Sequence, residues 1–570
     1  MSWPSLLQYG VFLLVVLVLV KPLGGYMARV FQGQRTWLDF LLRPVERLIY
    51  RLARVDTAFE MTWRQYAVSF ILFSLVGTIL LYLTLRLQHL FPFYDAVYLT
   101  TPLAPDLAMN TAVSFSTTTT WQAYGGETTM SYFSQLVGLT AQNFLAGAGG
   151  LAVGVAFIRG LAREQTDKLG NFWVDLVRAV LWILLPLSLL GSLILIWQGV
   201  PMNFNSYTQA TLLEGGSQTI AQGPVAALES IKNFGTNGGG FFNTNGAHPF
   251  ENPTPFANFL EMLFIVLLPA GLVNTFGRMT GRAREARTLL LAMVFLFVSG
   301  LVLCVAFEQR GNSALRRVIN ESALTMPNME GKEVRFGIGG SVLTAITTSN
   351  GATGSYNSMH DSFTPMGGGI APANMLLGEI VFGGLGTGFY SIVLIALVGL
   401  FLAGLMVGRT PEYLGKKISV AEIKYIMLYT LAAPLAVLVL TALAVVTQSG
   451  LAGLATNAGP HGFTEILYAY ASSFANNGQN FAGLAANSIF YNLTTAIAMM
   501  IGRFGLGIPA LALVGSFAMQ QRTPATLGTL PAYTFTFGVL VVGTALIVGG
   551  LSYFPALTLG PVLEHLLMNK

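Results

Sequence analysis

Four short tracts of hydroxyl, amide and glycine residues recur along this hydrophobic chain. They occupy residues 115–119, 234–238, 347–351 and 474–478, with the sequences FSTTT, FGTNG, TTSNG and FANNG. Such residues suit an irregular backbone that lines a polar pore, where carbonyl oxygens replace the hydration shell of an ion. A single tract is equally typical of an ordinary turn, which favours Gly and Asn. Four tracts in equivalent places favour four quarters of one cation filter.

The first tract differs from the other three. It has Thr119 where the other tracts end in Gly238, Gly351 and Gly478. Glycine readily adopts the positive φ that aims carbonyls at a pore axis, whereas threonine resists it. We therefore expect an asymmetric filter in which the Thr119 hydroxyl replaces a carbonyl ligand.

Polar side chains follow each tract and form a collar. Its members are Gln122, Asn243, His248, Glu251, His360, Asp361, Gln479 and Asn480. They would either brace the tracts from behind, with Gln122 and Asn243 as filter supports, or simply pack the loops. No ligand spacing supports a zinc site from His248 and His360, so no metal is expected beyond the transported cation. Lys232 is the one cation close to a tract, and it would point toward water or a carboxylate.

A glycine cluster interrupts the seventh apolar stretch. It consists of Gly383, Gly384, Gly386 and Gly388, and Glu379 lies just before it. Broken helices at membrane depth mark ion sites and gates, although small residues also allow close helix packing. We favour a gate.

Arg503 lies inside the ninth apolar stretch. A charge within a membrane span is a functional hypothesis by default. The arginine would either form a positive barrier beneath the filter or reach a carboxylate or the cytoplasmic interface.

The elements that must position these residues are membrane-spanning helices. The chain has 570 residues, 53% of them hydrophobic and 10% charged, against about 25% charged residues in soluble domains. A helix needs about 20 apolar residues to cross a bilayer. Ten stretches qualify, at 6–23, 65–86, 130–158, 172–198, 257–277, 288–307, 372–407, 425–447, 484–512 and 531–555. The predicted fold class is an all-α polytopic membrane protein.

Each tract follows a segment that could form a half-helix. These segments are 105–115, 225–234, 340–347 and 464–474. The C-terminus of such a helix carries a partial negative charge, which would favour a cation at the tract.

A pattern of span, outer loop with tract, span and basic inner loop occurs four times. Arg and Lys gather in every second loop, which predicts that these loops are cytoplasmic and that both termini are extracytoplasmic. We predict a pseudo-fourfold membrane–pore–membrane arrangement with four re-entrant pore loops. Its parts are the first span and basic cytoplasmic segment (1–64), repeats 65–171, 172–287, 288–424 and 425–530 with pore loops 105–122, 225–243, 340–357 and 464–480, and a last span (531–570).

No residue pattern predicts a catalytic site. The segment 167–170 (DKLG) resembles a phosphorylation motif but lacks the threonine that should follow the lysine, and its loop is too short for a nucleotide-binding domain. The phosphate-binding pattern G-x-x-x-x-G-K-[ST] does not occur. We therefore expect a non-enzymatic chain that needs a partner for any ATP-driven step.

Six strings in the chain resemble one family along nearly its whole length. They are 110–115 (NTAVSF), 236–243 (TNGGGFFN), 248–253 (HPFENP), 359–362 (MHDS), 408–415 (GRTPEYLG) and 476–478 (NNG). This is the KdpA family, the potassium-binding, channel-like subunits of bacterial Kdp potassium-transporting ATPases. The resemblance implies high-affinity binding of extracellular K⁺ and its delivery through an intramembrane tunnel to a P-type ATPase subunit. It also implies a single-span, periplasmic-facing subunit, a small membrane peptide, the bacterial inner (cytoplasmic) membrane and no cofactor.

The resemblance also assigns the filter. The implied K⁺-binding residues are Thr117, Thr118, Thr119, Thr120, Thr236, Asn237, Gly238, Asn350, Gly351, Asn476, Asn477 and Gly478. Gln122 corresponds to a residue implicated in ion affinity, and Arg503 to a charge below the filter. Two departures stand out, because the first tract is all Thr where Asn is expected, and segment 349–355 is longer than usual.

An alternative with the same architecture is a stand-alone K⁺ channel or an ion-coupled K⁺ transporter. A channel would pass current alone, whereas a pump subunit would not. A membrane enzyme lacks a metal or nucleophile constellation, and a scaffold would not need four polar tracts.

Overall fold

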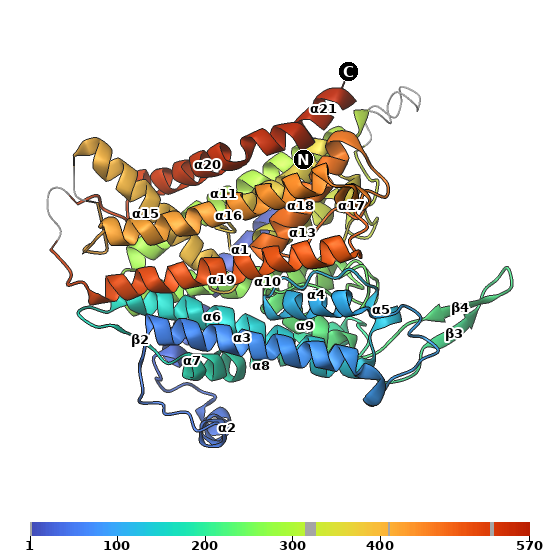
Figure 1. The fold of residues 1–570 in the computed structure, drawn as a ribbon, viewed down its shortest axis with the longest axis horizontal. Coiled ribbons are helices and arrows are strands. Elements are labelled where there is room, and N and C mark those ends of the chain that lie inside the picture. The colour runs from blue at the N-terminus through green and yellow to red at the C-terminus, as the bar shows by residue number, and fades with distance from the viewer. Residues whose placement is uncertain (1–2, 314–326, 409–410, 525–528, 570) are drawn as a thin grey trace.

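The protein is a bundle of long helices with shorter helices inserted at one end (Figure 1). The structure, a computed structural model, describes residues 3–313, 327–408, 411–524 and 529–569. Within these ranges ten helical segments are long and apolar enough to cross a membrane, which confirms the predicted number of spans. They are α1 (Trp3–Phe31), α3 (Trp63–Arg86), η2 (Ser134–Thr140) with α6 (Ala141–Ala162), α7 (Phe172–Arg178) with η3 (Ala179–Leu184) and α8 (Leu185–Trp197), α10 (Pro255–Thr280), α11 (Ala283–Arg310), α15 (Thr387–Val407), α16 (Val420–Val446), α19 (Ile489–Met519), and α20 (Phe535–Leu557) with η6 (Thr558–Val562) and α21 (Leu563–Met568).

Four shorter helices lead into the four tracts. They are α4 (Pro105–Ser116), α9 (Val225–Phe234), α13 (Gly337–Asn350) and α18 (Gly459–Ala475). Figure 1 shows them in the same half of the bundle, toward the end where both chain termini lie. The polar residues at their C-terminal ends, which include Thr117, Thr236, Thr348 and Asn476, are buried.

The helices that follow the tracts form the inside of the bundle. Most residues of the two spans that contain α6 and α10 are buried, whereas most residues of the spans that contain α1, α3 and α20 are accessible. α1 packs along α10, and α19 packs against α6, α16 and α18. The exposed apolar side chains of the outer helices, such as Leu72 and Leu80 of α3, suit contact with lipid.

The seventh predicted span, 372–407, is not one helix. It begins in the short helix α14 (Pro365–Leu376) and ends in α15, and residues 377–386 between them are irregular. Gly378 and Gly386 both have a φ of +87°, which glycine adopts at little cost. Only α15 has the length of a span.

Short elements complete the described ranges. The strands form antiparallel pairs, β1 (Met61–Thr62) with β2 (Lys168–Gly170), β3 (Thr208–Thr211) with β4 (Ser217–Ile220), and β5 (Glu412–Tyr413) with β6 (Lys416–Lys417). The remaining helices are α2 (Asp39–Leu52), η1 (Gln88–Leu90), α5 (Gly126–Thr129), η5 (His360–Ser362) and α17 (Gln448–Leu451). The β3–β4 hairpin extends outward at the end that holds the pore helices, and α2 lies across the direction of the long helices (Figure 1).

Candidate ion-binding filter

Three of the four tracts share an alternating backbone. Residues with positive φ stand two apart in them, at Thr118 and Thr120, at Thr236 and Gly238, and at Asn476 and Gly478. In the third tract Ala352 has a φ of +49°, and Gly354 stands two residues after it. Matched on this pattern, the equivalent last positions are Thr120, Gly238, Gly354 and Gly478. The predicted equivalence of Thr119 with Gly238 was thus one residue short. We expected threonine to avoid a positive φ, but Thr118 and Thr120, the two neighbours of Thr119, both adopt one.

The second and third tracts are joined by backbone hydrogen bonds. Gly238 and Gly354 form a parallel bridge. The amide of Gly239 donates to the Gly354 carbonyl at 3.1 Å, and the amide of Gly354 donates to the Asn237 carbonyl at 3.0 Å. Two segments more than 100 residues apart therefore run side by side.

The other neighbours approach closely through glycine. A Cβ on Gly478 would lie 2.3 Å from the Thr119 carbonyl oxygen, and one on Gly354 would lie 2.9 Å from the Asn477 carbonyl oxygen. A Cβ on Gly238 would lie 2.7 Å from the Thr120 hydroxyl. Each tract thus touches the next, from the first through the second, third and fourth and back to the first. We call this closed arrangement the ring.

The third member of the ring is Gly354, not Asn350 or Gly351. Asn350 is the last residue of α13, and its side-chain amide donates to the Ile346 carbonyl at 2.8 Å. Gly351 follows as the C-cap, with Ile265 of α10 where a Cβ would be. Because α13 continues to Asn350, the last position of the third tract is Gly354, three residues later than the predicted Gly351.

The ring geometry suits a cation. Alternation of left-handed and ordinary backbone turns successive carbonyls toward the same side, as a filter made of carbonyl oxygens requires. The left-handed region costs a threonine of order 1 kcal/mol, and such strain persists only where the surroundings hold it. The C-terminal ends of four helices add partial negative charge at the same place.

Gln122 braces the first two tracts. Its side-chain amide donates to the Gly240 carbonyl at 3.0 Å, and its carbonyl accepts from the Gly240 amide at 3.0 Å. Glu251 supports the chain beyond, since its carboxylate accepts from the amides of Phe241 (2.7 Å) and Gly246 (2.6 Å). The backbone amide of Asn243 donates to the Glu127 carboxylate at 2.9 Å. Asn243 itself is exposed.

Amide side chains tie the fourth tract to its neighbours. Asn476 donates to the Thr119 hydroxyl at 2.9 Å and to the Met499 carbonyl of α19 at 3.0 Å. Asn477 donates to the Thr348 carbonyl at 2.9 Å. Gln479 donates to the Ser355 carbonyl at 2.8 Å. These side chains therefore fix the tract, and its backbone carbonyls are left as candidate ligands.

A vestibule opens onto the ring from the end that holds the pore helices. This cavity, of about 1010 Å³, is lined by residues that include Gln122, Asn243, His360, Gly478 and Asn480. Burial, with a smaller contribution from Lys332, lowers the pKa of His360 to about 3. His360 contacts the Tyr468 hydroxyl, whereas His248 stacks on Phe242. The two histidines thus have different surroundings.

Lys232 lies behind the second tract. Its ammonium group is fully buried and forms an ion pair of 2.6 Å with Glu229, one helical turn before it on α9. The lysine therefore points toward a carboxylate, one of its two predicted orientations. It adds no positive charge to the ring itself.

Arg503 lies directly beneath the first tract. Its guanidinium group donates to the Thr118 hydroxyl at 3.1 Å and to the Ala146 carbonyl of α6 at 2.8 Å, and it lies 5.2 Å from the ring centroid of Phe70. It is buried, and its described partners include no carboxylate. A positive charge thus stands next to the ring, at the mid-depth of α19.

The irregular segment 377–386, which we call the crossing loop, passes under the second and third tracts. The Leu385 amide donates to the Thr236 hydroxyl at 2.9 Å. A Cβ on Gly384 would lie 3.1 Å from the Ala352 side chain, and one on Gly386 would lie 2.2 Å from the Gly150 carbonyl. The glycines therefore allow the loop to lie between the filter tracts and α6.

Comparisons with known proteins identify the family of the chain. Residues 10–566 match the sequence model of KdpA, described as the potassium-transporting ATPase A subunit. The chain belongs to the KdpA family. Its relatives include proteins named potassium-transporting ATPase potassium-binding subunit. The one from Methylorubrum extorquens is 54% identical over 99% of this chain and 97% of its own length, and the one from Solibacter usitatus is 50% identical over 100% and 99%.

A solved structure shares the fold of this KdpA-family chain. The potassium transporter TrkH from Vibrio parahaemolyticus superposes with a TM-score of 0.52, over 89% of this chain and 97% of that one. The sequences are 13% identical. The membrane–pore–membrane architecture predicted from the sequence is confirmed.

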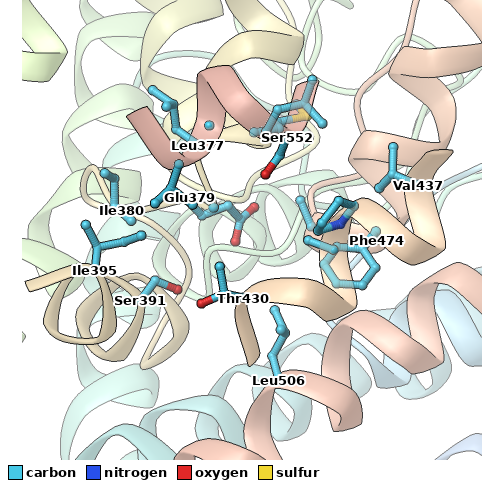
Figure 2. A pocket seen from close by; sticks show the side chains of 18 of the residues that line it. Leu377, Glu379, Ile380, Ser391, Ile395, Thr430, Val437, Phe474, Leu506 and Ser552 are labelled. Atoms are coloured by element: carbon cyan, nitrogen blue, oxygen red, sulfur yellow. The ribbon is translucent and has the colours of Figure 1, made fainter. Parts of the chain in front are cut away.

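A second cavity, of about 80 Å³, lies next to the fourth tract (Figure 2), and we call it the inner cavity. Its lining comes from the end of α14, from the crossing loop and from α15, α16, α18, α19 and α20, and it includes Phe474 and Asn476 at the fourth tract. Figure 2 shows the Glu379 carboxylate pointing into the cavity. Glu379 is buried, and its Oε1 has no hydrogen-bond partner among the described residues.

Sequence reasoning missed several residues of the site. Gly354 and Thr353 were not assigned to the filter because the predicted half-helix ended at residue 347, whereas α13 ends at Asn350. The Glu229–Lys232 pair has the spacing of one helical turn, which could have been recognised. The Glu251 contacts join backbone amides of an irregular segment, for which side-chain spacing carries no signal.

Proposed function

We propose that this chain is the potassium-binding and translocating subunit of an ATP-driven, high-affinity K⁺ import complex. The observation that carries the proposal is the closed ring of four polar tracts, three of which have an alternating backbone. Family membership and the names of close relatives support K⁺ as the ion and an ATPase as the complex. The chain supplies selection and passage, and a partner supplies the energy.

The proposed filter follows the corrected equivalence. Its ligands are backbone and hydroxyl oxygens of Thr117, Thr118, Thr119 and Thr120, of Thr236, Asn237 and Gly238, of Ala352, Thr353 and Gly354, and of Asn476, Asn477 and Gly478. Asn350 and Gly351 terminate α13 and orient the third tract. Gln122 is a positioning residue, and Asn243 lines the vestibule.

Below the filter, the ion is proposed to turn sideways. Arg503 opposes straight passage by its charge, and the crossing loop, with Gly383, Gly384, Gly386 and Gly388, closes the space under the second and third tracts. Glu379 lines the inner cavity together with Asn476 and offers a buried carboxylate to an ion that leaves the fourth tract. The inner cavity leads from there between α15, α16 and α20 toward the flank of the bundle, where an ATPase subunit would receive the ion.

We also propose the repeat boundaries, the membrane orientation and the partner subunits of the chain, from the sequence pattern and the family. The four repeats keep the predicted boundaries, and the outer vestibule faces the extracytoplasmic side, with both termini. The partners are a P-type ATPase subunit, a single-span periplasmic-facing subunit and a small membrane peptide. The membrane is the bacterial inner membrane.

The test is K⁺-stimulated ATP hydrolysis by the intact complex that carries Gly238→Asp. Gly238 has a φ of +156°, and a Cβ there would lie 2.4 Å from the Gly354 amide nitrogen. We expect the K⁺ concentration for half-maximal stimulation to rise tenfold or more, which is about 1.4 kcal/mol of binding free energy. The complex should remain assembled, as measured by co-purification of its subunits.

Gly215→Asp is the matched control. Gly215 lies in the β3–β4 hairpin with a φ of +86° and no other atom within 4 Å of a Cβ. We expect its K⁺ dependence to equal that of the wild type. Unchanged K⁺ dependence in Gly238→Asp would refute the filter, and K⁺ current through the chain reconstituted alone would favour a channel over a pump subunit.

A further inference from the structure

A cluster of ionisable side chains lies outside the filter, where three separate segments meet. Asp361 comes from η5, His461 and Glu465 from the first turns of α18, and Glu564 from α21. His461 Nε2 lies 2.9 Å from Asp361 Oδ1, and its Nδ1 lies 2.8 Å from Glu564 Oε1. One ligand atom from each of Asp361, His461 and Glu465 lies within 4.8 Å of the other two. We call these three residues the outer triad.

The cluster has more negative charge than its described partners neutralise. Three carboxylates surround one imidazole, so the group carries a net charge of −3 with the neutral imidazole that a metal ligand must be, and a divalent ion would reduce this to −1. Among the described residues, the ion pairs of Asp361 and Glu564 are with His461 only. A divalent cation would therefore offset most of this charge.

Glu465 provides a second, independent observation. Its side chain is completely buried, and its Oε2 has no hydrogen-bond donor among the described residues. A buried carboxylate oxygen without a partner costs of order 1–3 kcal/mol. The Asn457 side-chain amide lies between the carboxylates, 2.7 Å from Glu465 Oε1 and 3.4 Å from Asp361 Oδ2. A donor therefore occupies the place where a cation would contact both.

The ligand types are those of a transition metal. Imidazole nitrogen and carboxylate oxygen are both Zn²⁺ ligand types, and three protein ligands leave a fourth position for water. His461 and Glu465 stand four residues apart on one helix and so share a face. Glu564 accepts from the other imidazole nitrogen, which is the carboxylate–histidine contact that orients metal-binding histidines.

We propose that the outer triad, Asp361, His461 and Glu465, binds a divalent transition-metal ion, with Zn²⁺ as the best fit. Ligand atoms about 2.0 Å from zinc stand roughly 3.3 Å apart, so the two carboxylates close inward and the Asn457 amide rotates away. Asp361 and His461 are part-exposed, so the ion can enter from the solvent. This site revises the expectation that K⁺ is the only metal bound by the chain.

The site would stabilise the mouth of the filter. α18 carries the fourth tract at its other end, and His360, next to Asp361, contacts the Tyr468 hydroxyl, which donates to Gln479. A bound ion would thus join α18, the segment after the third tract and the C-terminal helix. Its role is to hold these segments together, since the site has no contact with the transported ion.

The experiment measures Zn²⁺ binding by the intact, chelator-treated complex in detergent, by isothermal titration calorimetry and by elemental analysis after gel filtration. Glu465→Gln preserves the shape of the side chain and removes one ligand charge. We expect the wild type to bind one more Zn²⁺ per complex than Glu465→Gln, and Glu564→Gln to bind it about tenfold more weakly. His565→Gln, which changes the part-buried histidine that follows Glu564 in the chain and contacts the Phe307 ring, is the matched control and should bind as the wild type does.

A second readout identifies the ligands. Co²⁺ in a site with nitrogen and oxygen ligands has visible absorption that reports its geometry, and this band should appear in wild type and His565→Gln but not in Glu465→Gln. Thermal unfolding of the metal-free proteins checks that Glu465→Gln is folded. Equal Zn²⁺ stoichiometry and affinity in wild type and Glu465→Gln, or loss of binding in His565→Gln, would overturn the proposal, while the filter assignment would stand unaffected.

Discussion

At the scale of single residues, the filter is asymmetric. Three of the four equivalent last positions are glycine, and the first is Thr120, with a φ of +49°. Its hydroxyl is buried without a hydrogen-bond partner among the described residues and faces Gly238. An unpaired hydroxyl at such a position is a candidate ion ligand. The hydroxyl ligand that we expected from Thr119 is therefore supplied at least in part by Thr120.

Thr120→Val should weaken K⁺ binding. The substitution keeps the branched shape and removes the hydroxyl, so the half-saturating K⁺ concentration for ATP hydrolysis should rise at least fivefold, or about 1 kcal/mol. Thr120→Ser retains the hydroxyl and should restore most of the affinity. If valine and serine variants have the same K⁺ dependence as the wild type, the Thr120 hydroxyl is not a ligand.

Arg503→Gln should allow passive leak of K⁺. The substitution removes the charge beneath the first tract and leaves a side chain that can still donate to the Thr118 hydroxyl. We expect K⁺ efflux from proteoliposomes without ATP to exceed that of the wild type severalfold. Arg284→Gln, at a residue whose guanidinium group lies over the Tyr533 ring, is the control and should not leak. Tight vesicles with Arg503→Gln would contradict the barrier.

At the scale of elements, the pore helices and the crossing loop divide the work. The four helices bring the tracts together with their C-terminal ends, and the loop closes the space beneath. Four tracts, their preceding helices and the glycine break were recognisable in the sequence because polar residues stand out in apolar surroundings. The register of the third tract was not, because it depends on where α13 ends, and no side chain signals that the helix continues to Asn350.

Gly386→Ala should disturb the crossing loop. The added Cβ would lie 2.2 Å from the Gly150 carbonyl, and the φ of +87° disfavours alanine. We expect the melting temperature of the complex to fall and the coupling of ATP hydrolysis to K⁺ uptake to be impaired, at a cost of order 1–3 kcal/mol. Gly408 has a similar φ of +69°, but no other atom lies within 4 Å of a Cβ placed there. Gly408→Ala is therefore the control that has the backbone strain without the steric clash. Equal effects of the two variants would exclude a specific role for the contact with α6.

At the scale of the whole molecule, one chain builds a filter that other architectures assemble from separate subunits. Hydrophobic length and basic loops were sufficient to predict ten spans and the membrane–pore–membrane fold. The Glu251 contacts and the inner cavity were not predictable, because they join segments whose packing the sequence pattern does not encode. The proposed function depends most on the ring, which all four repeats build together.

The measurement that tests the ring most directly is an electron-density map of the complex with Tl⁺, a K⁺ analogue whose anomalous scattering identifies it. If the ring binds the ion, we expect a peak enclosed by the carbonyl oxygens of Thr119, Asn237, Thr353 and Asn477, and the loss of this peak in Gly238→Asp. Tl⁺ bound elsewhere in the chain, with no peak inside the ring, would show that the ring is not the filter.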